Sequence, residues 1–106
     1  MFKGANGMAG LMKQANQMQM KMKKAQEELA LREFSGTSGG GAVTAKVNGD
    51  NKVLAITITP DVMKSGDVEM LQDLVTSAVN DALKVAKETS SQEMSKITGG
   101  LSIPGF

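Results

Sequence analysis

The sequence predicts an α+β fold, a two-layer α-β-β-β-α domain built on a three-stranded antiparallel sheet. Three observations predict this fold. Apolar residues recur at helical spacing towards both ends of the chain, and they alternate with polar residues in the middle segment. Glycine-rich or Asn-Gly turns separate the alternating runs. A chain of 106 residues has room for one domain, which we expect to span 1–106.

The first element is expected to be a long helix over 8–32, preceded by a glycine-spaced, flexible lead-in at 1–9. Apolar residues there are spaced alternately three and four apart, which is the pattern of a seam between two helices. Such a helix is longer than a small core covers, so part of it either projects into solvent or pairs with another chain. The seam residues are Met8, Leu11, Ala15, Met18, Met22, Ala25 and Leu29.

The segment 34–59 is expected to form three short antiparallel strands. The first strand breaks at the glycine run 39–41. Val43, Ala45 and Val47 alternate with polar residues in the second. In the third, Leu54, Ile56 and Ile58 alternate with Ala55, Thr57 and Thr59. The sequence Asn-Gly-Asp-Asn at 48–51 is a strong signal for a tight hairpin turn. Pro60 ends the third strand because proline supplies no ladder N–H.

A second long helix is expected over 67–97, with Asp67 as its N-cap and glycines at 99 and 100 as its stop. The tail 98–106 is too short for a further element. Three strands leave two open sheet edges, and the chain has only three aromatic residues to fill a core. We therefore expect a dimer that joins through sheet and helices. The apolar stripe of this helix comprises Leu71, Leu74, Val75, Ala78, Ala82, Val85 and Ala86, widened by Val79 and Leu83.

The composition excludes several functional classes. The chain has neither cysteine nor histidine, which excludes disulfides, Cys/His zinc sites and the Ser-His and Cys-His nucleophile arrangements. No paired carboxylates with an acid/base partner emerge, and Asp67, Glu69 and Asp73 do not match a calcium loop. We expect no enzyme, no cofactor and no metal. No run of about 18 apolar residues indicates a membrane span, so the cytoplasm is the expected location.

The charge is distributed unevenly along the chain. Residues 1–26 hold five lysines and no acid, whereas residues 60–83 hold five acids and one lysine. On the heptad register, Lys13, Lys23 and Lys24 fall on outward positions and Lys21 flanks the seam. An ordinary solvated face is the simpler interpretation. We favour an anion-binding surface, because a merely soluble helix usually mixes charges of both signs.

Several segments carry a family resemblance: the methionine- and glutamine-rich first helix ending AQEEL, the SGGG run, ITITP, and VNDALKVAKETSSQEMSKITGGLSIPGF. Together they resemble the YbaB/EbfC family of bacterial nucleoid-associated proteins over nearly the whole chain. The resemblance implies a small α/β homodimer that binds double-stranded DNA with little or modest sequence preference, its helices projecting like the arms of tweezers. It also implies a place in the cytoplasmic nucleoid and a role in nucleoid organisation or gene regulation.

The candidate DNA contacts lie mainly on the first helix. Its lysines are expected to hold phosphates, and two neighbouring amides suit adenine edges. Lys84 and Lys87, on the second long helix, give a weaker signal. An alternative is a dimeric scaffold whose methionine-rich arms hold replication or repair proteins. A membrane-surface helix is less favoured because the helix lacks tryptophan. The full candidate set is Lys13, Lys21, Lys23, Lys24, Asn16, Gln17, Lys84 and Lys87.

Overall fold

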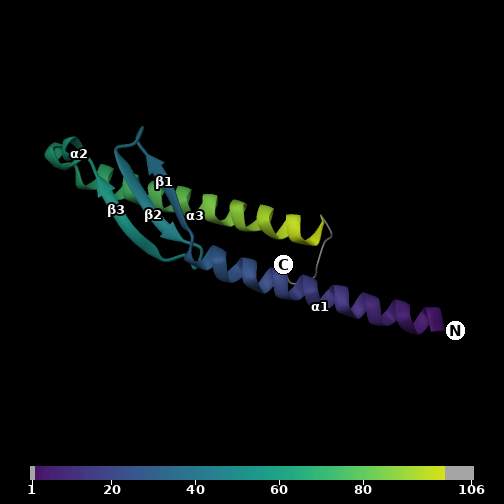
Figure 1. Ribbon diagram of the computed structural model, residues 1–106. Helices are drawn as coiled ribbons and strands as arrows, with labels where there is room; N and C mark the ends of the chain where they lie inside the picture. Colours follow the sequence, from purple (N-terminus) through teal and green to yellow (C-terminus); the bar gives the residue numbers. More distant parts are fainter. Residues whose placement is uncertain (1, 100–106) are drawn as a thin grey trace.

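The computed structural model describes the backbone of residues 2–99 and the side chains of residues 7–99. It confirms the predicted order of a helix, three antiparallel strands and a long helix, and it adds one short helix. The molecule is elongated, with principal extents of 77 × 20 × 17 Å (Figure 1). The expected tail from residue 100 onward lies outside the described residues. The elements are α1 (Phe2–Leu31), β1 (Glu33–Ser38), β2 (Val43–Asn48), β3 (Val53–Ile58), α2 (Pro60–Ser65) and α3 (Val68–Thr98).

Helix α1 begins at Phe2, so the flexible lead-in expected at 1–9 is wrong for residues 2–9. Once a helix is nucleated, each further residue adds one hydrogen bond for one fixed residue. Glycine lowers helix propensity but, unlike proline, it still supplies its N–H. The helix anchored by its C-terminal half therefore extends through the glycine-spaced segment. Its end lies far from the sheet (Figure 1).

The three strands form an antiparallel sheet in the order β1-β2-β3. The predicted hairpin turn joins β2 to β3, and the Asn48 side chain accepts hydrogen bonds there from the N–H groups of Asp50 and Lys52. Asn51 takes a left-handed φ of 63° in this turn. The glycine run at 39–41, with φ between 59° and 96°, joins β1 to β2 as expected.

The segment between the sheet and α3 contains the short helix α2, which the sequence did not predict. Pro60 stands at its start, where a missing N–H costs no helical hydrogen bond. Six residues are too few to show a helical period, so only the strand-ending role of Pro60 was visible. Asp67 caps α3 as predicted, since its Oδ1 accepts a hydrogen bond of 3.0 Å from the Met70 N–H. Gly99 ends α3 in a left-handed conformation.

The core lies where α3 crosses one face of the sheet over β1 and β2. Ala78, Ala82 and Ala86 of the predicted stripe are buried there, whereas Val85, which we expected within the stripe, is 36% exposed at its margin. Because the helix offers only small side chains, it approaches the sheet backbone closely at Gly36. A Cβ at Gly36 would overlap the Ala82 backbone nitrogen and lie 2.6 Å from the Ala78 carbonyl oxygen. The sheet side of the core comprises Phe34, Val43, Ala45 and Val47.

The two edges of the sheet differ. On the β1 edge, the Thr37 N–H donates a 3.0 Å hydrogen bond to Asp81 Oδ2, and the Ser38 hydroxyl donates to the Leu74 carbonyl, both on α3. On the β3 edge, Val53, Leu54 and Ile56 are 49%, 46% and 37% exposed. Helix α3 therefore occupies one backbone N–H of the β1 edge and leaves β3 uncovered.

The close approach of α3 to Gly36 leads to a first prediction. Gly36→Ala is expected to lower the free energy of unfolding by about 3 kcal/mol, because the helix backbone must move away from the sheet. Thermal unfolding followed by circular dichroism at fixed protein concentration measures the change. Gly10→Ala is the control, since a Cβ at Gly10 meets nothing within 4 Å. Equal stability of Gly36→Ala and the wild type would contradict the close packing.

A second prediction concerns the hydrogen bond at the β1 edge. Asp81→Ala is expected to cost about 1 kcal/mol of unfolding free energy, because the Thr37 N–H loses its acceptor. Asp81→Asn keeps an amide oxygen at the same place and is expected to lose less than half as much. Chemical denaturation of the three proteins tests this order. If the asparagine variant is as unstable as the alanine variant, the hydrogen bond does not act as described.

Candidate nucleic-acid interface

Helix α1 is fixed at its C-terminal half and free at its N-terminal half. Met22 and Leu29 of the predicted seam are buried, at 5% and 7% exposure. The hairpin turn holds the end of the helix, because the Gly49 N–H donates to the Arg32 carbonyl at 3.1 Å. A Cβ at Gly49 would overlap the Leu29 carbonyl. The other end of the seam is uncovered, with Met8 and Leu11 67% and 66% exposed.

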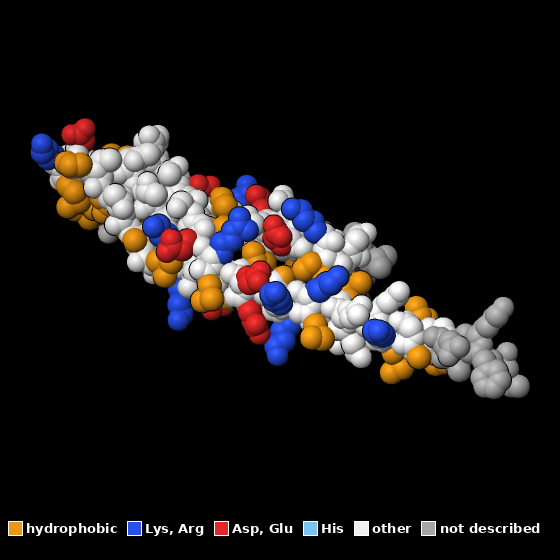
Figure 2. Space-filling view, viewed as in Figure 1, with side chains coloured by type: hydrophobic (Ala, Val, Ile, Leu, Met, Phe, Trp, Pro, Cys, Tyr) orange, Lys and Arg blue, Asp and Glu red, His pale blue; other side chains and the backbone are white. Residues whose placement is uncertain are grey.

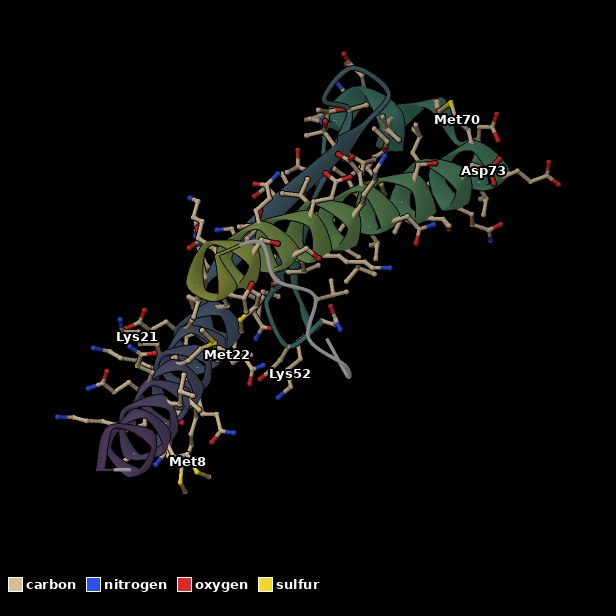
Figure 3. The ribbon with its side chains drawn as sticks, turned by 90° about the vertical axis from the view of Figure 1, so that its right-hand side faces the viewer. Met8, Lys21, Met22, Lys52, Met70 and Asp73 are labelled. Carbon is tan, nitrogen blue, oxygen red and sulfur yellow. The ribbon has the colours of Figure 1, made fainter. Side chains whose placement is uncertain are left out.

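The predicted lysines lie away from the buried part of the seam. With 3.6 residues per turn, Lys13, Gln17 and Lys24 share the side of α1 opposite Met22 and Leu29. Lys21 and Lys23 lie on the two flanks of that side, and Asn16 lies near it. All of these side chains are exposed. Figure 3 shows Lys21 and Met22 pointing to different sides of the helix.

The described α1 lysines are not neutralised by ion pairs with acidic side chains. Among side chains 7–99, the ion pairs are Lys46–Glu33 at 3.6 Å and Lys96–Glu93 at 3.8 Å, and neither involves α1. Residues 2–26 of the helix contain no acid. The space-filling view shows basic side chains spaced along α1 (Figure 2). This part of the molecule is therefore a basic projection, and we call it the basic arm, residues 7–26.

Lys84 and Lys87 form a separate group on α3. Both are exposed, and they surround a shallow hollow of about 470 Å³ together with other α3 side chains, one of them acidic. None of the described α1 side chains, from residue 7 onward, lines this hollow. The two helices run side by side near the C-terminal end of α3, yet these lysines do not join those of the basic arm in one site (Figure 1). The remaining lining residues are Glu88, Ser91 and Gln92.

The opposite end of the molecule is acidic. Asp67, Glu69 and Asp73, at the start of α3, line an open hollow of about 390 Å³ with Met70, Leu74 and Ser77. Figure 3 shows Met70 and Asp73 at the far end of the molecule from Met8. The charge asymmetry of the sequence is therefore a separation in space along the long axis. Sequence reasoning missed the roles of Asp81 at the β1 edge and of Gly36 and Gly49 in the packing, because these depend on contacts between distant segments.

A lysine-bearing helix that extends beyond its core is typical of proteins that bind a polyanion. The comparison with known families makes this specific. The model of the YbaB/EbfC DNA-binding family matches residues 3–101, and the chain belongs to this family. The resemblance recognised from the sequence is thereby confirmed.

Several relatives are similar over nearly the whole chain. A nucleoid-associated protein of Clostridium novyi is 53% identical over 103 residues, covering 97% of this chain and 90% of the relative. A nucleoid-associated protein of Caldanaerobacter subterraneus is 50% identical over 105 residues, covering 99% and 95%. The crystal structure of an uncharacterized protein, HP0035 from Helicobacter pylori, matches the fold with a TM-score of 0.66 at 23% identity, covering 86% of this chain and 92% of that one.

Within the described part of the chain, no helix combines the length and the apolar character that a membrane crossing requires. The same residues contain no group of three or more acids placed to hold a metal ion. The basic arm is the candidate interface that the geometry offers in this member of a DNA-binding family.

Proposed function

We propose that this chain binds duplex DNA as a homodimer, mainly through phosphate contacts, on the nucleoid in the cytoplasm. The observation that carries the proposal is the basic arm, a projecting helix with its lysines opposite the buried part of its seam. The role is binding rather than catalysis, in nucleoid organisation or gene regulation. Membership of a DNA-binding family and the names of the bacterial relatives support it.

Phosphate contacts fit the side chains of the arm. Lysine is a point charge on a flexible stem, so it holds phosphates without reading bases. Arginine is the commonest reader of guanine, and the single arginine of the chain, Arg32, lies 5.6 Å from the centroid of the Phe34 ring at the base of the arm. Asn16 and Gln17 offer amides for adenine edges, which supports at most a slight sequence preference.

The open β3 edge supports the homodimer. On the core side of the sheet, Ile56 lies opposite Ala45, yet Ile56 is 37% exposed while Ala45 is fully buried. An uncovered apolar strand with unpaired backbone groups favours pairing with another strand. A second copy paired along β3 covers this strip and doubles the number of arms. The β1 edge suits pairing less well because Asp81 already occupies the Thr37 N–H.

A second candidate function is a dimeric scaffold that acts with replication or repair proteins. The observation that favours it is the exposed apolar part of α1, where Met8, Leu11 and Met12 are 67%, 66% and 65% exposed. Methionine is adaptable and suits surfaces that accept partners. Such binding depends on the apolar residues and tolerates salt, whereas phosphate binding depends on the lysines and weakens with salt. The two functions are therefore separable by experiment.

The dimer leads to a third prediction. Ile56→Lys is expected to convert the dimer to the monomer of 11.1 kDa, because it places a charge in the proposed contact along the edge strand. Sedimentation velocity measures the mass. Thr57→Lys is the matched control, since Thr57 is an exposed neighbour whose side chain points to the other sheet face. A dimer that survives Ile56→Lys would place the contact elsewhere.

The arm leads to a fourth prediction. Changing Lys13, Lys21, Lys23 and Lys24 together to Gln is expected to abolish most binding to random-sequence duplex DNA, because the phosphate contacts are lost. If about eight phosphates are engaged per dimer, the wild type follows a log-log salt slope of about −7. Fluorescence anisotropy at several salt concentrations measures both quantities.

The matched control for the arm variant is Lys84→Gln combined with Lys87→Gln, which removes the separate α3 group and is expected to bind nearly as the wild type. All proteins are first shown to be folded dimers. A salt slope near zero for the wild type, or undiminished binding by the arm variant, would contradict phosphate binding by α1. Loss of binding in the α3 control alone would move the interface to α3.

A further inference from the structure

One large apolar side chain lies on the lysine side of the basic arm. Met20 is 72% exposed, the highest value among the described methionines of the chain. At 3.6 residues per turn, Met20 lies about 160° around the helix from Met22. The other large apolar side chains described in the arm lie within about 80° of Met22, and they are Met8, Leu11, Met12 and Met18.

Basic and amide side chains surround Met20. Gln17 stands about one turn before it and Lys24 about one turn after it, on the same side of α1. Lys21 and Lys23 lie on its two flanks, between about 60° and 100° around the helix. A polyanion that contacts these lysines therefore encloses Met20 as well. Because a thioether carries no charge and no hydrogen-bond donor, its contact lies on an apolar group of the ligand rather than on a phosphate.

The major groove of duplex DNA offers such a group where the arm fits. A helix with its side chains is about 10–12 Å across, which suits the major groove of about 12 Å and not the minor groove of about 6 Å. In the major groove, the lysines on the two flanks of α1 face the backbones of the two strands. Met20, near the middle of the lysine side, then faces the base edges. The apolar group on that surface is the C5 methyl of thymine.

An acid after the basic arm limits the length of the contact. Glu27 lies about one turn beyond Lys24 on the same side of α1, where its charge repels a phosphate. Residues 13–24 therefore form the contacting stretch, which is about 17 Å long at 1.5 Å per residue. This length matches about five base pairs at 3.4 Å each. Met20 lies inside this stretch and not at its margin.

Building on the proposed binding of duplex DNA, we propose that Met20 contacts the C5 methyl of thymine in the major groove and gives the arm a preference for A·T pairs. Gln17 stands about 4.5 Å before Met20 along the helix, so its amide reaches adenine in a neighbouring base pair. The lysines hold the phosphates and carry no sequence information directly, whereas these two side chains read bases. Met20 thus adds a base contact to the phosphate contacts of the arm.

Replacing thymine by uracil in an A·T-rich duplex tests the contact, because it removes the C5 methyl and leaves the hydrogen-bonding groups of the base pair unchanged. The wild type is expected to bind the uracil duplex about threefold more weakly for each methyl contacted, which is the effect of burying one such group. Met20→Ala is expected to bind the two duplexes equally. Fluorescence anisotropy measures the affinities.

Leu11→Ala is the matched control, because Leu11 is 66% exposed on the side of α1 that Met22 occupies. It is expected to keep the wild-type ratio between the two duplexes. Alanine is the best helix former, so neither change weakens the helix. Both variants keep every lysine and are expected to keep the wild-type salt slope. A wild type that binds both duplexes equally, or Met20→Ala protein that retains the preference, would overturn the contact.

Oxidation of the wild-type methionines by hydrogen peroxide gives an independent readout. A saturating A·T-rich duplex is expected to slow sulfoxide formation at Met20 at least about fivefold, because the reaction follows the exposure of the sulfur. Met8, 67% exposed on the Met22 side of α1, and Met63, 58% exposed on α2, are expected to react at unchanged rates. Tandem mass spectrometry of tryptic peptides measures each rate. Undiminished oxidation of Met20 in the complex, or equal slowing at Met8, would contradict the assigned contact.

The salt dependence separates failure of the Met20 contact from failure of the DNA function. Salt-dependent binding by the wild type without a preference for thymine over uracil sinks the contact and leaves phosphate binding by the arm standing. Absence of salt-dependent binding to either duplex sinks both. Salt-dependent binding with a thymine preference that Met20→Ala abolishes and Leu11→Ala retains supports both.

Discussion

The structure depends on the close contact between the alanine stripe of α3 and the backbone of β1 at Gly36. Ala78 and Ala82 leave so little between the helix and the sheet that only glycine fits at that place on the strand. This contact sets the position of α3 over β1 and β2, where the buried side chains gather. It also places Asp81 beside the Thr37 N–H, so the same packing that builds the core occupies one hydrogen-bond donor on the β1 edge of the sheet.

The position of α3 leaves the β3 edge of the sheet uncovered. A helix centred on β1 and β2 does not cover β3, and a core built mainly from alanine and valine buries little apolar surface per residue. The chain is therefore left with an uncovered strand and a helix that extends beyond its support. Both features are expected of a protein completed by further copies rather than by a larger core.

The sequence predicted the elements whose signals are local. Alternation and turn residues located the three strands, and Asp67 and Gly99 marked the ends of α3. The start of α1 was missed because glycine spacing suggests a flexible segment, whereas the helix propagates from an anchored half. Helix α2 is too short to show a period. Gly36, Asp81 and the exposure of Val85 depend on how α3 crosses the sheet, which no single segment encodes. The lysines were found because their charge is local, but the separation of Lys84 and Lys87 from α1 required the fold.

Different forces act on the different sides of helix α1. On the lysine side, attraction to phosphates is long-ranged and is screened by salt over about 10 Å at 0.1 M. On the apolar side, attraction requires contact and is insensitive to salt. Phosphate binding by the lysines and contacts of the apolar side therefore respond differently to added salt.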